Sequence, residues 1–226
     1  MNAPFLFDWP ANLVPDDVTI RPPRKTAGLS TSLSEFTQTV PVIRPPFGLK
    51  LVFGTLFAAE VLAWRAMEGL FEGRANRVRV PLFDLWFRAT DVEIGAGAVT
   101  HADGTAFSDG TLYLTDDLSG VTVTGVQGQR HITVDFGSYG QLLQGGLYFG
   151  IGEFPYLATM VSWEGSVATI RCTPTLRETC IATPLKLKPT MIAGLQSDDG
   201  AELALTKARY GAPTIELVER FDVLFS

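Results

Sequence analysis

The segment Tyr156-Leu-Ala-Thr-Met-Val-Ser-Trp-Glu-Gly-Ser-Val-Ala-Thr-Ile-Arg-Cys172 decides the fold class of this chain. Its two ends, Tyr156–Val161 and Val167–Cys172, are rich in β-branched and apolar residues, which favour strands. Between them, Trp163-Glu-Gly-Ser166 contains the glycine that suits a tight turn. The segment therefore predicts a β-hairpin.

The same alternation of short strand and turn extends over residues 99–188. Asp-Gly, Ser-Gly and Gly-Gly pairs separate the apolar runs and mark the turns. Further strands are expected at Leu112–Thr115, Val121–Thr124, His131–Phe136 and Leu147–Phe149. Short strands at this spacing indicate a small barrel or sandwich.

The two ends of the chain are also β-rich. Residues 1–50 are interrupted by prolines every few positions, which predicts edge strands such as Val18–Ile20 and Phe36–Val40. Later strands are expected at Leu49–Phe53, Asn76–Val80, Leu82–Phe87, Thr190–Leu195 and Pro213–Val218. The stretch from Ala201 to Ala208 fits a strand or a helix equally well.

One segment has the period of a helix instead. Five apolar residues recur there at spacings of four, three, three and four: Phe57, Val61, Trp64, Met67 and Phe71. Such spacing places them on one face of an α-helix. We expect this helix at about 56–72, with Thr55 as its N-cap and Gly73 as its left-handed end.

These patterns predict a mainly β protein in two parts. Residues 1–95 together with 189–226 would form a β-sandwich that carries the helix, and residues 96–188 would form an inserted small β-barrel. The small-residue run at 94–98 and the segment Thr183–Pro189 would be the two connections between them.

The charge balance argues against binding to nucleic acid. The chain has 226 residues, 18 basic and 24 acidic, with a net charge of −6. Non-specific binding to DNA or RNA depends on Lys and Arg at the phosphates.

The sequence also contains no apolar run long enough for a membrane span, and its first residues do not resemble a secretory signal. We therefore expect synthesis in the cytosol.

Motifs for catalysis, cofactors and metals are absent from the sequence. His101 with Asp103 and Asp109 lacks the ligand spacing of a calcium loop, and two Asp-Gly turns explain these carboxylates better. Cys172 and Cys180 are expected as buried thiols, although a hairpin can bring such a pair into disulfide range. We predict no catalytic, cofactor-binding or metal-binding residues and no enzymatic activity. His131 is expected as a half-exposed strand residue.

Three stretches resemble the distal tail proteins and related minor tail proteins of siphophages, including prophage and gene-transfer-agent relatives. The first combines Trp9-Pro10, Leu13-Val-Pro15 and Ser34–Thr39 with the helical segment Leu56–Arg74. The second runs from Leu142 to Gly152 and continues through Tyr156–Thr159 and Ala168–Arg177. The third is Ile215–Asp222, which is similar to the closing strand of that family.

This resemblance implies a structural protein of the virion. It implies a homohexameric ring that joins the tail tube to the hub at the tail tip, with tube, tape-measure and hub proteins as partners. A carbohydrate-binding module for attachment to the host surface is the alternative, because aromatic residues such as Trp86, Trp163 and Tyr148 suit a sugar groove. An exposed aromatic platform would distinguish the two.

Overall fold

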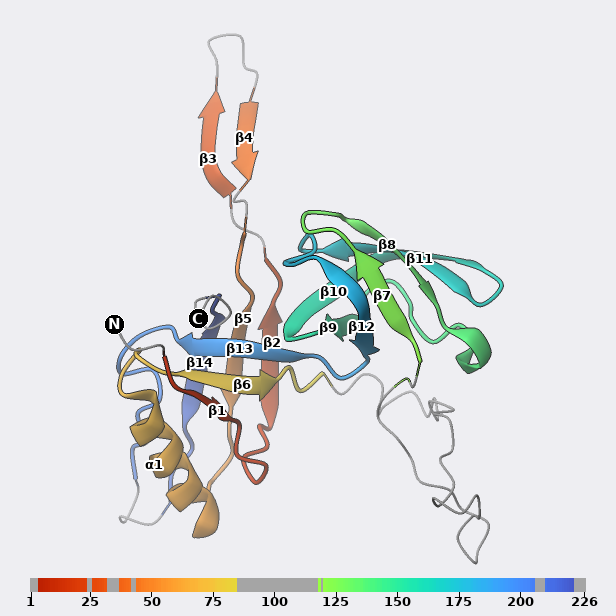
Figure 1. The fold of residues 1–226 in the computed structure, drawn as a ribbon. Coiled ribbons are helices and arrows are strands. Elements are labelled where there is room, and N and C mark those ends of the chain that lie inside the picture. Colours follow the sequence, from red (N-terminus) through yellow and green to blue (C-terminus); the bar gives the residue numbers. More distant parts are fainter. Residues whose placement is uncertain are drawn as a thin grey trace, which may run out of the picture. The chain divides into compact units, whose positions relative to one another are not determined.

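The computed structural model describes residues 4–23, 26–31, 37–41, 44–84, 118, 120–205 and 210–221. The chain divides into two compact units (Figure 1). Unit 1 comprises residues 1–82 and 191–226, and unit 2 comprises residues 83–190. The sequence placed these divisions at 95/96 and 188/189. The small-residue run at 94–98 lies outside the described residues, so its role as a connection stays a prediction.

Unit 1 is built on a six-stranded sheet with the order β1-β6-β13-β14-β5-β2. Its strands are β1 (Leu6–Asp8), β2 (Asp17–Arg21), β5 (Gly48–Val52), β6 (Arg77–Pro81), β13 (Thr190–Leu195) and β14 (Thr214–Glu219). The β13, β14, β5 and β2 neighbours pair antiparallel, whereas β1 runs parallel to β6. The first and last parts of the chain therefore share one sheet.

The core of unit 1 lies between this sheet and helix α1 (Ala59–Phe71). Four of the five residues predicted on the apolar face are buried: Val61, Trp64, Met67 and Phe71. The prediction was wrong for Phe57, which precedes the helix and is exposed. The indole of Trp64 packs edge-on to Phe53, just after β5, with ring centroids 5.1 Å apart. Its Nε1–H donates to the carbonyl oxygen of Ala201 at 2.8 Å. The Trp64 side chain thus contacts two segments outside the helix, the one after β5 and the one that contains Ala201.

The predicted start of the helix was three residues too early. Leu56 forms an isolated bridge with Gly211 and donates its N–H to the Gly211 carbonyl at 2.8 Å. This bridge keeps the chain extended past Thr55, which therefore does not cap the helix. Instead, the Glu60 carboxylate accepts the N–H of Phe57 at 2.9 Å, as an acidic residue in the first turn can. At the other end Glu72, followed by Gly73, is left-handed.

Two further strands form a separate hairpin. β3 (Thr26–Thr31) pairs antiparallel with β4 (Thr37–Pro41). Among the described residues these strands pair only with each other, so they make a two-stranded sheet (Figure 1). The sequence predicted β4 but not β3, because Thr26-Ala-Gly-Leu-Ser-Thr31 has no alternating apolar pattern.

Unit 2 is a second six-stranded sheet, with the order β7-β12-β9-β10-β11-β8, that curls into a nearly closed barrel. Its strands are β7 (Thr122–Gly125), β8 (His131–Asp135), β9 (Tyr148–Ile151), β10 (Phe154–Glu164), β11 (Val167–Thr173) and β12 (Cys180–Lys186). The predicted hairpin is the β10–β11 pair, in which Glu164 faces Val167. Gly165 at its tip has φ +63°, a conformation that favours glycine.

The predicted fold class is confirmed: the protein is mainly β, and its described residues form a first β unit with one α-helix and a barrel-like second unit. The predicted connection at Thr183–Pro189 was wrong for its first four residues. Residues 183–186 belong to β12, which pairs with β7 and β9 inside unit 2. The alternation of buried and exposed residues in β12 is broken between Cys180 and Thr183, where the pairing with β7 shifts register and Ala182 has φ +49°. The strands expected at Leu82–Phe87 and Leu112–Thr115 lie wholly or mostly outside the described residues.

A fragment of residues 83–190 is expected to fold by itself, because it contains a complete sheet and its own buried core. The amide signals of the purified fragment in a two-dimensional NMR spectrum should be as widely dispersed as those of a folded β protein. Collapsed signals, or aggregation of the fragment under conditions that keep the full chain in solution, would refute an autonomous unit 2.

Candidate functional site

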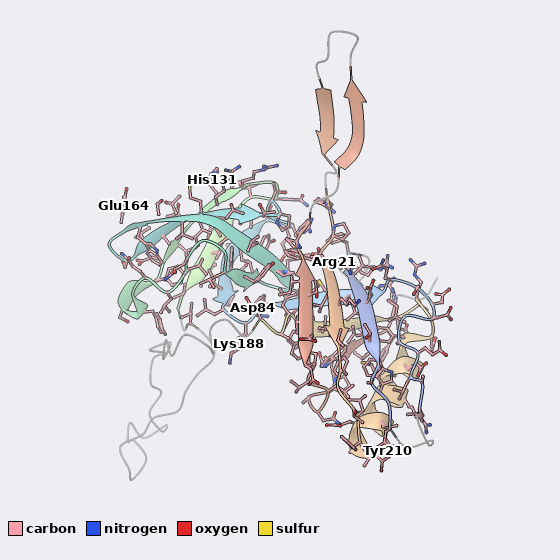
Figure 2. The ribbon with its side chains drawn as sticks, turned by 180° about the vertical axis from the view of Figure 1, so that it is seen from behind. Arg21, Asp84, His131, Glu164, Lys188 and Tyr210 are labelled. Atoms are coloured by element: carbon pink, nitrogen blue, oxygen red, sulfur yellow. The ribbon has the colours of Figure 1, made fainter. Side chains whose placement is uncertain are left out.

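The residues that the sequence singled out for chemistry do not form a catalytic centre within the described part of the chain. His101, Asp103 and Asp109 lie outside the described residues. His131 is exposed at the first position of β8, where it faces Arg171 across the sheet (Figure 2). Among the residues with described positions, no three His, Cys, Asp or Glu side chains gather as metal ligands would. None of the described helices is long and apolar enough to cross a membrane.

Both cysteines are buried, unpaired thiols in unit 2. Cys172 donates its S–H to the Arg130 carbonyl at 3.4 Å, and Cys180 donates to the Glu178 carbonyl at 3.6 Å. Burial raises the pKa of Cys172 to about 11, and burial together with the nearby Glu178 raises the pKa of Cys180. Because the thiolate is the reactive form, both groups are poor nucleophiles at neutral pH.

This burial predicts a loss of stability at alkaline pH. The pKa of Cys172 is about 11 in the folded chain against an ordinary value of 9.0. The unfolded chain therefore releases its proton first, and stability declines as the pH rises from 9 to 11. The contribution is on the order of 2 kcal/mol. The melting temperature of Cys172→Ala should fall less steeply over this range than that of the wild type; equal slopes would contradict the expectation.

The described tryptophans do not form an exposed platform for a sugar ring. Trp9 and Trp64 are core residues of unit 1, and their indole N–H groups donate to the carbonyls of Leu13 and Ala201. Trp163 is half-buried in unit 2, with its ring 5.1 Å from that of Phe136. Trp86 lies outside the described residues. Three aromatics are exposed among the described residues, Phe5, Phe57 and Tyr210, and all three belong to unit 1.

Two parts of unit 1 present strand edges that other chains can use. β2 is a terminal strand of the six-stranded sheet and pairs, among the described strands, with β5 alone. The β3–β4 hairpin has two such edges, and neither of its strands contains a charged residue. Unpaired backbone N–H and C=O groups at sheet edges favour pairing with another chain, and charged side chains are a usual protection against it.

A groove of about 1020 Å³ lies in unit 1 at the end of β2 that leads toward the hairpin. Three arginines from distant parts of the chain line it: Arg21 at the end of β2, Arg74 after α1 and Arg220 after β14. Figure 2 shows Arg21 at this end of the sheet and Tyr210 at the other. Pro22, Pro46, Phe47 and Phe221 supply apolar walls.

Backbone carbonyls accept hydrogen bonds from two arginines, Arg220 of the lining and Arg77 next to it. Buried Arg77 donates from Nη1 to the carbonyls of Arg74, Ala75 and Asn76 at 2.8, 3.2 and 2.8 Å. Arg220 donates from Nη2 to the Leu195 carbonyl at 3.2 Å. A Cβ at Gly194 would lie 3.2 Å from Arg220 Nε and 3.3 Å from Arg77 Nη1, so glycine leaves room for both guanidinium groups.

Acidic groups also lie near the groove: the Asp198 carboxylate is 3.6 Å from the position of a Cβ on Gly73, the residue before Arg74. Glu216 is shared between Arg21, at 3.3 Å, and Lys50, at 3.8 Å. Buried Glu219 accepts the Phe47 N–H at 2.8 Å. Arg74 is exposed and has no ion pair with any described carboxylate.

The sequence offered no signal for this site, because its arginines come together only in the folded sheet.

Comparison with known proteins identifies no relative: no family model matches the chain, and no curated protein matches it.

Proposed function

We propose that this chain is a structural protein of a bacteriophage tail, a distal tail protein whose copies form a ring between the tail tube and the hub at the tail tip. Its proposed partners are further copies of itself and the tube, tape-measure and hub proteins. Its proposed location is the virion. The observation that carries most weight is the β3–β4 hairpin.

A two-stranded hairpin is marginally stable in water unless something packs or pairs with it. Among the described strands, β3 and β4 have no partner other than each other. Their sequences, Thr-Ala-Gly-Leu-Ser-Thr and Thr-Gln-Thr-Val-Pro, contain no charge that would protect an open edge. A neighbouring subunit that covers the hairpin supplies the missing contacts, and this is the situation that a ring creates.

The β2 edge supports the same proposal. Copies that join head to tail form a closed ring when the rotation between neighbours fits, and each copy then offers one surface to the preceding copy and another to the next. The hairpin and the β2 edge belong to the same unit and are continuous along the chain through Pro22 and Pro23. A hairpin of one copy and a sheet edge of the next are therefore suitable complementary surfaces.

Quantitative mass spectrometry of purified particles tests the proposal: the chain should be present in the same copy number as a single ring of tail-tube protein. A chain absent from the particle, or as abundant as a capsid protein, would refute it.

A further inference from the structure

We propose that the arginine-lined groove of unit 1 binds an acidic segment of another polypeptide, in which carboxylates alternate with apolar side chains. The proposal does not depend on the ring, because the groove is a feature of the single chain. It rests on the lining residues Arg21, Arg74 and Arg220 and on the apolar walls between them.

The charge of the groove is opposite to that of the whole chain. The protein has a net charge of −6, yet three of its arginines line this one groove. Arg74 has no ion pair among the described residues, and Arg21 must share Glu216 with Lys50. Guanidinium groups match the geometry of a carboxylate and can bind it through two parallel hydrogen bonds. An incoming carboxylate therefore finds an available cation at Arg74.

The walls of the groove favour a peptide over a small anion. Part of the lining is apolar surface, which an inorganic anion cannot cover. It is formed by Pro22, Pro46, Phe47 and Phe221. A volume of about 1020 Å³ accommodates several side chains. A peptide that carries single negative charges and apolar side chains therefore matches the charge, the walls and the size of the groove.

A displayed library of random peptides, selected on the immobilised full-length chain, tests this inference. Peptides enriched in Asp and Glu together with apolar residues are expected. Their affinity should fall steeply between about 0.1 M and about 1 M NaCl, because the Debye length falls from about 10 Å to about 3 Å over that range. Enrichment of neutral or basic peptides, or no enrichment, would overturn the proposal.

A set of arginine variants then locates the binding site. Arg74→Ala should weaken the selected peptides about tenfold, the effect of losing one charge-assisted hydrogen bond. Arg74→Lys should keep part of the affinity, because it retains the charge without the planar group. The matched control is Arg65→Ala, which removes an exposed arginine of α1 outside the groove and should bind as the wild type does.

Two results, one from these variants and one from a separate titration, would contradict the assignment. Equal affinities of Arg74→Ala and Arg65→Ala would place the peptide elsewhere on the surface. Calorimetric titration with inorganic phosphate and with pyrophosphate should show no saturable binding; tight binding of either at the groove would identify a phosphate site instead. Both readouts use the isolated chain, so they are independent of whether the chain is found in a ring.

Discussion

Replacing residues 26–41 by a short Gly-Ser linker is expected to abolish assembly of the chain into particles. The hairpin is the proposed contact with the neighbouring copy. Because all the interfaces of a closed ring are the same, the replacement removes this contact from every one of them. In particles produced with this variant as the only copy of the gene, the chain should be absent from purified tails, and tail completion should fail.

The same deletion should leave the rest of unit 1 intact. Among the described strands, β3 and β4 pair with no strand of the six-stranded sheet. The melting temperature of the purified variant should therefore match that of the wild type, and this measurement separates an assembly defect from misfolding. A variant that enters tails at wild-type copy number would show that the hairpin is dispensable for the ring.

Trp64→Ala is expected to have the largest effect on stability, about 3–5 kcal/mol. Trp64 is fully buried, packs edge-on to Phe53 and donates its indole N–H to the Ala201 carbonyl at 2.8 Å. The substitution leaves a cavity between the helix and the sheet and removes the partner of a buried carbonyl. Since whole domains are stable by about 5–15 kcal/mol, unit 1 would lose a large part of its stability.

The matched control for Trp64→Ala lies on the same helix. Leu62 is 65% exposed on the opposite face of α1, so Leu62→Ala should change the free energy of unfolding by no more than about 0.5 kcal/mol. Urea titrations followed by circular dichroism would measure both variants. Similar effects of the two substitutions would mean that α1 does not pack as described.

The elements with a clear period could be predicted from the sequence. The apolar spacing from Val61 to Phe71 identified the buried face of α1, and the Glu-Gly turn identified the β10–β11 hairpin. In both cases the deciding interactions are between residues close in the sequence. Local pattern is then sufficient, because it determines which side chains share a face.

Elements fixed by distant partners could not be predicted in the same way. The start of α1 depends on the bridge between Leu56 and Gly211, and β12 is recognisable as a strand only by its pairing with β7 and β9. The groove is the extreme case, because Arg21, Arg74 and Arg220 belong to three separate segments. Tertiary contacts decided each of these features, and no sequence pattern records them.

Cryo-electron microscopy of intact tails shows whether this chain forms the proposed ring. We expect a closed ring of this chain at the distal end of the tail tube, with residues 1–50 in contact with neighbouring copies; the resemblance to distal tail proteins implies a homohexamer. A single copy per tail, or a position on the capsid, would refute the proposed ring.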